Sequence, residues 1–249
     1  MRMWMPFQVL FYQPIYNLFV GFYHVIPDLG IVIIVVTLLI KIVLYPLTAK
    51  SIRAQKSLSE LQPKLESIKK EHKGDQQKIA QETMKLYKEH KVNPLGSCLP
   101  ILIQMPVLFA MFYVLRDGFD PASFRFLYSF ISPPESINSV SLGFFDLSER
   151  SVVLALLAGG AQFWQSRMMT TKKPPKGVGE GAKDENLMAM MNKQMLYFMP
   201  VITVIIGMQF PAGLALYWFL STLFTAIQQW LLFKKKKSDG GPIEGQLVL

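Results

Sequence analysis

Long apolar stretches constrain this chain more than any other feature. A helix needs about 20 mostly apolar residues to cross the hydrocarbon core of a bilayer. Only 17% of the 249 residues are charged, whereas soluble domains carry about 25%. We therefore predict an all-α polytopic membrane protein with five transmembrane helices, at about residues 29–47, 95–115, 151–168, 195–210 and 214–233.

Lysine and arginine are concentrated in alternate loops. Residues 48–94, residues 165–194 and the tail after Phe233 together hold 21 of them, whereas residues 1–28 and 116–151 hold four. The positive-inside rule therefore predicts an extracytoplasmic N-terminus and a cytoplasmic C-terminus. The basic loops do not indicate direct nucleic-acid readout, because such a surface would interleave basic residues with stacking aromatics.

The predicted loops and termini differ in character. Residues 48–92 are predicted to form a cytoplasmic helical hairpin with a break near Gly74, either a connector or a mobile docking surface for a partner. The Pro- and Gly-rich residues 172–186 predict a flexible loop, and residues 234–249 a basic, disordered cytoplasmic tail. We predict that residues 1–28 form an extracytoplasmic, interfacial amphipathic helix. Residues 3–23 could instead form a sixth transmembrane span, although polar residues and prolines interrupt them.

Lys41 is a charged residue inside the first predicted span. A lysine well inside a span costs about 2.5–3.5 kcal/mol even on lenient insertion scales. It lies about six residues before the cytoplasmic end, roughly 9 Å along a helix. Its ammonium group can therefore extend to the lipid headgroups, or it can line a hydrated cavity within the bundle.

Polar residues in the other spans favour the cavity. A single hydrogen bond between membrane helices contributes only about 0.6 kcal/mol on average. Here four of the five predicted spans carry polar side chains, which suggests a hydrophilic groove open to the cytoplasm. The candidate groove residues are Lys41, Thr37, Gln104, Gln162, Gln165, Trp218, Thr222 and Thr225.

The residue types exclude several chemistries. The spans hold no acidic residue and no nucleophile–base set, and Cys98 is the only cysteine. We therefore expect no enzyme activity, no cofactor and no metal site. A cation in a wet cavity can attract acidic residues of a polypeptide that crosses the membrane. A small transporter or channel, or a structural assembly factor, remains an alternative use of the same cavity.

One sequence block is specific. Residues 93–106 have the pattern Asn-Pro-x-Gly-x-x-x-Pro-x-x-x-Gln-x-Pro, and this block resembles the YidC/Oxa family of membrane-protein insertases, in a bacterial short form without the large periplasmic domain. Four further segments are similar to the same family: Tyr45–Thr48, Leu61–Lys64, Phe198–Val201 and Phe210–Trp218.

The resemblance implies a fold, a function and partners. It implies a five-helix core around a cytoplasm-open groove in the bacterial inner membrane. It also implies a chaperone that inserts nascent or small membrane proteins, Sec-independently or with the Sec translocon. Clients and lipids are then the partners, with the translocon and the ribosome as candidates. Lys41 stands where the bacterial family usually has arginine, and Thr37 and Trp218 fall at positions that line the groove.

Overall fold

The computed structural model describes residues 5–93, 99–117, 120–169 and 194–239, and this part of the chain is mostly helical. The all-α prediction is confirmed at this level. The predicted flexible loop 172–186, residues 95–98 of the second predicted span and the end of the predicted tail lie outside the described residues.

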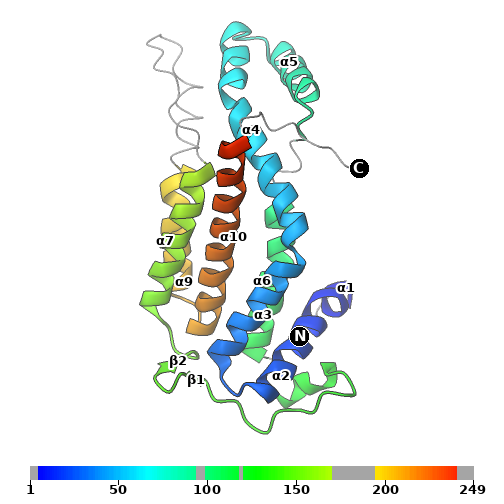
Figure 1. Cartoon of the computed structure of the whole chain (residues 1–249), viewed down its shortest axis with the longest axis vertical. Coiled ribbons are helices and arrows are strands. Elements are labelled where there is room, and N and C mark those ends of the chain that lie inside the picture. The colour runs from blue at the N-terminus through cyan, green and yellow to red at the C-terminus, as the bar shows by residue number, and fades with distance from the viewer. Residues whose placement is uncertain (1–4, 94–98, 118–119, 170–193, 240–249) are drawn as a thin grey trace.

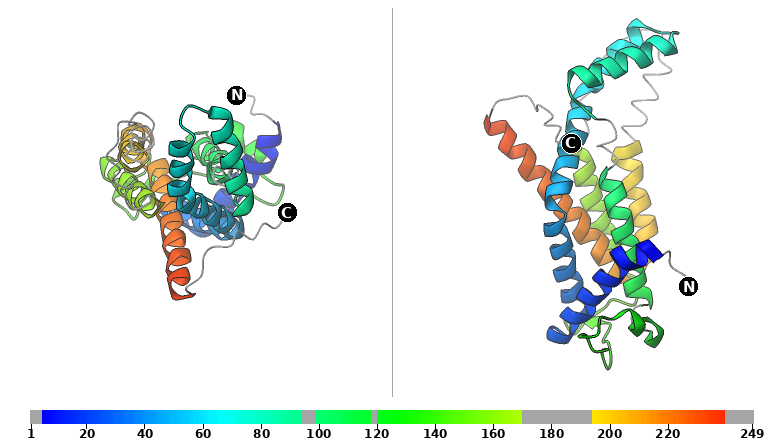
Figure 2. Two further views of the ribbon diagram at one scale, coloured as in Figure 1. Left: turned by 90° about the horizontal axis from the view of Figure 1, so that it is seen from above. Right: turned by 90° about the vertical axis from the view of Figure 1, so that its right-hand side faces the viewer.

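The N-terminal segment is helical and packs into the core. It consists of α1 (Met5–Phe7), a π-helical turn (Gln8–Tyr12) and α2 (Gln13–Val25). The inner face of α2 carries Tyr16, Phe19 and Val20, which are fully buried where α2 packs against its neighbours in the bundle. This segment crosses the lower part of the bundle obliquely (Figure 2).

The first predicted span is shorter than expected. Helix α3 (Leu29–Val43) ends at Leu44, and α4 (Tyr45–Glu71) begins with a 67° change of direction. Pro46, in the first turn of α4, has no N–H group, and its ring would clash with the carbonyl four residues earlier in a continuous helix. The predicted span at residues 29–47 therefore contains a sharp bend and is not one continuous helix in the structure.

Helices α4 and α5 (Gln76–Glu89) project together from one end of the bundle (Figures 1 and 2). The turn between them contains Gly74, whose φ of 96° is typical of glycine. Asp75 then caps α5, because its carboxylate accepts a hydrogen bond from the Lys78 N–H at 2.9 Å. Leu61 and Leu65 of α4 and Leu86 of α5 are buried, as expected for apolar stripes that face other parts of the protein.

The bundle is completed by α6 (Leu99–Asp117), α7 (Val152–Met169), α9 (Met199–Gly207) and α10 (Ala212–Asp239), with a π-helical turn at Gln194–Phe198 before α9. Helix α10 packs against α3, α6 and α7, and α7 packs against α9 (Figure 1). The contact between α7 and α9 needs Gly159, because a Cβ atom there would overlap the Val204 side chain. Among the described residues, no single helix has the length and hydropathy of a membrane span, whereas the bent pair α3–α4 has both.

Two predicted boundaries around α10 differ in the structure. The turn after α9 was expected at Pro211–Gly213, but Ala212 and Gly213 already belong to α10. Their N–H groups donate to the carbonyls of Glu149 and Leu147, which satisfies the first turn of the helix. At its other end α10 continues to Asp239, so the first residues of the tail predicted to be disordered are helical.

Asp28 joins α3 to the loops at the other end of the bundle. Those loops contain a 3₁₀ helix (Pro121–Phe126) and the antiparallel strands β1 (Val140–Ser141) and β2 (Phe145–Asp146). The Asp28 carboxylate accepts hydrogen bonds from the Ile31 N–H (3.0 Å), the Ser141 hydroxyl (2.6 Å) and the Leu142 N–H (2.7 Å). Burial alone would raise its pKa, but these hydrogen bonds outweigh burial and hold the pKa of Asp28 below its ordinary value.

We predict that Asp28→Asn lowers the free energy of unfolding by about 1–2 kcal/mol at neutral pH, because an amide cannot accept all three hydrogen bonds. The contribution of a carboxylate with a lowered pKa is present at neutral pH and is lost as the pH falls through its value in the folded protein. The difference between the native chain and the variant should therefore close in acid. Thermal unfolding in detergent micelles measures both effects.

The control is Asp75→Asn, which changes a simple cap at the start of α5 and should cost little, since asparagine caps helices as well as aspartate does. An equal loss of stability in both variants, or a loss for Asp28→Asn that does not depend on pH, would contradict the assigned role of Asp28.

Candidate functional site

Lys41 lies in the last turn of α3, half-buried between three helices. Its ammonium Nζ donates to Thr225 Oγ1 of α10 at 3.0 Å and to Gln104 Oε1 of α6 at 3.3 Å. Both acceptors are neutral, so they orient the ammonium group without cancelling its charge. Two of its three N–H groups are used in this way.

Gln104 connects this lysine to the centre of α10. Its Nε2 donates to the Tyr217 hydroxyl at 2.8 Å and to Ser221 Oγ at 3.0 Å. Because both N–H groups are engaged on α10, the amide oxygen is turned toward Lys41. We call the hydrogen-bonded residues Lys41, Gln104, Tyr217, Ser221 and Thr225 the polar cluster.

The polar cluster joins α3, α6 and α10 inside the bundle. Tyr217 is 1% exposed and Ser221 is 3% exposed, so their hydroxyl groups need partners within the protein. Thr225 also donates to the Ser221 carbonyl oxygen at 2.9 Å, which leaves its oxygen free to accept from Lys41. Removal of one member would therefore leave others without a partner.

Three of the eight candidate groove residues belong to this cluster, namely Lys41, Gln104 and Thr225. Thr37 lies one turn earlier on α3 and is buried, but its hydroxyl donates to the Ile33 carbonyl oxygen at 2.6 Å. Thr222 is buried in α10 next to Ser221. Trp218 is half-buried, with its ring 6.5 Å from that of Phe210.

Gln162 and Gln165 lie elsewhere. Both are half-buried on α7, which packs against α10. In the described part of the chain, no hydrogen bond joins either of them to the polar cluster. The structure therefore brings together Lys41, Gln104 and Thr225, one predicted residue from each of α3, α6 and α10.

Two members of the cluster, Tyr217 and Ser221, were not among the predicted site residues. Their signal is the spacing of four along α10, because Tyr217, Ser221 and Thr225 recur on one helical face. A second connection was also missed. The Thr48 hydroxyl donates to Gln228 Oε1 at 3.1 Å, and Gln228 Nε2 donates to the Tyr45 carbonyl oxygen at 3.2 Å. These bonds join the beginning of α4 to α10, just beyond the bend at Leu44.

Comparison with known proteins gives one family. Residues 21–239 match the model of the family described as 60Kd inner membrane protein. A relative named membrane protein insertase YidC, from Fusobacterium nucleatum subsp. nucleatum, is 40% identical over 208 residues, which cover 84% of this chain and 87% of the relative.

Two longer relatives carry the same name. The protein of Magnetococcus marinus is 35% identical over 91% of this chain, and that of Prosthecochloris aestuarii is 34% identical over 98%. This chain covers 36% and 39% of their lengths, respectively. The residues that match the family model, 21–239, include the helices that form the polar cluster.

We predict that Gln104 and Tyr217 are energetically coupled. Gln104→Leu should lower the free energy of unfolding more than Tyr217→Phe, because it also removes a partner of Lys41 and of Ser221. A double-mutant cycle, measured by unfolding in mixed micelles, should give a coupling energy of about 0.6 kcal/mol.

The matched control pairs Gln104→Leu with Ser59→Ala. Ser59 donates to the Met169 carbonyl oxygen, outside the polar cluster, so these two changes should be additive. Additivity of Gln104→Leu with Tyr217→Phe as well would mean that the hydrogen bond between them is not formed in solution.

Proposed function

This chain belongs to the 60Kd inner membrane protein family, and we propose that it inserts integral membrane proteins into the bacterial inner membrane and helps them to fold. Family membership supports a multi-pass membrane protein, and the names of the relatives support the insertase function. The Fusobacterium relative adds weight because the alignment covers most of both chains. Clients and lipids are then the partners of this chain, with the Sec translocon and the ribosome as further candidates.

The observation that carries the proposed mechanism is the environment of Lys41. Its charge lies among apolar helices and is held by two neutral oxygens. A carboxylate about 4 Å from such an ammonium group gains roughly 4 kcal/mol at an effective dielectric constant of about 20. An acidic residue that crosses a membrane pays several kcal/mol, so Lys41 offsets a substantial part of this cost.

Little free energy is needed for Lys41 to change its hydrogen-bond partner from Gln104 to a client carboxylate. The bond to Gln104 is 3.3 Å long and its acceptor is a neutral amide oxygen, so a client carboxylate can replace it with a shorter bond between opposite charges. Gln104 remains attached to Tyr217 and Ser221 in the meantime. The polar cluster thus keeps its shape while the lysine changes partner.

The groove that we propose is lined by the eight predicted residues Lys41, Thr37, Gln104, Gln162, Gln165, Trp218, Thr222 and Thr225. It opens toward the end of the bundle from which α4 and α5 project, which is the cytoplasmic side in our orientation. In this proposal it is surrounded by five spans, at about residues 29–47, 95–115, 151–168, 195–210 and 214–233. The apolar segment of the client then moves into lipid along α3 and α10, and its partition into lipid drives the reaction.

Cysteine labelling tests the orientation. In a Cys98→Ser background, Ser136→Cys should react with an impermeant maleimide from outside the cell, and Ser67→Cys should react only after the membrane is opened. Both positions are exposed in the structure, so access to the reagent depends on the membrane alone. Labelling of Ser67→Cys in intact cells would show that the orientation is the reverse of the one proposed. The groove would then not open to the cytoplasm.

Substitution of Lys41 tests the mechanism. In liposomes that contain the purified protein, Lys41→Arg should retain insertion of a client with an acidic translocated segment. Lys41→Ala should reduce insertion by about tenfold or more, since each 1.4 kcal/mol is a factor of ten. Lys41→Glu should be worst, because it adds repulsion to the loss of attraction.

Two controls separate this effect from a change in folding or surface charge. Lys50 is exposed on α4, and Lys50→Ala and Lys50→Glu should leave insertion unchanged. The second control is the same client with its translocated acids changed to Asn or Gln, which should depend much less on Lys41. Equal dependence on Lys41 for both clients would exclude the electrostatic mechanism.

A further inference from the structure

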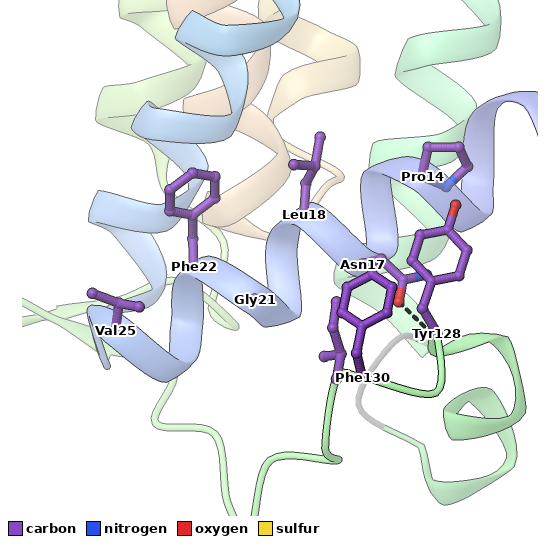
Figure 3. A pocket seen from close by; sticks show the side chains of 9 residues that line it. Pro14, Asn17, Leu18, Gly21, Phe22, Val25, Tyr128 and Phe130 are labelled. Carbon is purple, nitrogen blue, oxygen red and sulfur yellow. Dashed lines mark hydrogen bonds between the residues drawn. The ribbon is translucent and has the colours of Figure 1, made fainter.

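An apolar groove of about 450 Å³ lies on the far side of α2 from the bundle core. Figure 3 shows Leu18, Phe22 and Val25 of α2 on one side of it, and Tyr128 and Phe130, from the loop after the 3₁₀ helix, on the other. The remaining lining residues are Pro14, Asn17, Gly21 and Ile131.

The lining is unsuited to a polar ligand. Its only amide side chain, that of Asn17, is fully used, because Nδ2 donates to the carbonyl oxygens of Gln13 and Phe126 and Oδ1 accepts from the Tyr128 N–H. None of the lining residues carries a charge. A ligand that fits this groove is therefore a hydrocarbon chain or an apolar side-chain surface.

Both faces of α2 are apolar, although only one is covered by protein. The inner face is fully buried at Tyr16, Phe19 and Val20, whereas Val25 is 78% exposed and Phe130, across the groove, is 80% exposed. An exposed apolar patch of this kind normally marks a contact with protein or with a membrane. Since the chain belongs to an inner membrane protein family, lipid is available to cover the second face.

We propose that this groove binds an acyl chain of a membrane phospholipid, which thereby holds α2 and the loop around Tyr128 at the membrane interface. The inference rests on the membrane location in the proposed function but not on Lys41. The buried face of α2 separates the groove from the bundle interior, where the polar cluster lies, so a client segment bound at that cluster would not occupy the groove.

Gly21 provides a direct way to fill the groove. A Cβ atom at this position would meet only Ile131 Cδ1, at an ordinary distance of 3.8 Å. Gly21→Phe can therefore place its ring in the groove without entering the core. Leu10→Phe is the matched control, because Leu10 is 67% exposed on the preceding helical turn and does not line the groove.

The experiment uses the full chain in vesicles of phosphatidylethanolamine and phosphatidylglycerol with a trace of phospholipid that carries a photoactivatable diazirine in one acyl chain. After illumination, mass spectrometry locates the labelled residues. We expect label at residues 14–25 and 128–131, loss of that label in Gly21→Phe, and full labelling in Leu10→Phe. A second variant, Phe130→Ala with Ile131→Ala, removes one wall and should also lose label.

Several outcomes would overturn the proposal. They are undiminished labelling of residues 14–25 in Gly21→Phe, equal loss in Leu10→Phe, or labelling of this groove by a photoreactive client segment and not by lipid. Failure of the insertion assay with Lys41 variants is a separate result, since it tests the polar cluster. Melting curves of each variant in detergent show whether it is folded.

Discussion

The positive charge of Lys41 is the constraint around which the bundle is arranged. An ammonium group among apolar helices is tolerated only when nearby oxygens accept its hydrogen bonds, and here α6 and α10 each supply one. The acceptor on α6 is itself oriented by two hydroxyl groups of α10. These hydrogen bonds fix the rotation of the three helices about their own axes. Rotation of any one of them would leave several polar groups without partners.

Helix α10 has a second role as the centre of packing. It packs against α3, α6 and α7, and it places small or hydroxyl-bearing residues at the contacts, among them Ala215, Ser221, Thr222 and Ala226. Small residues let helix backbones approach closely, which is the main source of attraction between helices in a membrane. The same helix therefore provides both close packing and the hydrogen bonds that orient Lys41.

Much of this arrangement was predictable, and the exceptions have physical reasons. Apolar length and the charge at Lys41 indicated a helical bundle with a polar interior, and the polar residues inside other spans made Gln104 and Thr225 candidates for the same groove. Tyr217 was missed because an aromatic residue in a span is ordinarily apolar contact surface, and its hydroxyl matters only once Gln104 faces it. The position of Gln162 and Gln165 depends on the rotation of α7, which is decided by contacts such as Gly159 with α9 and not by composition. The bend at Leu44 follows from Pro46, but its 67° angle depends on tertiary contacts such as Thr48 with Gln228.

Because of that bend, a small change of angle at Leu44 would displace the far end of α4 by several ångströms. Its 27 residues reach about 40 Å from the pivot at Leu44. A rotation of roughly 10° at the pivot would therefore carry the far end, and α5 with it, through about 7 Å. Near the pivot, α4 is held to α10 by the bonds of Gln228 with Thr48 and Tyr45, and farther along by the Ser59 hydroxyl on the Met169 carbonyl oxygen. All three hydrogen bonds lie in the part of α4 between Tyr45 and Ser59, so a small displacement there corresponds to a larger one at the far end of the helix.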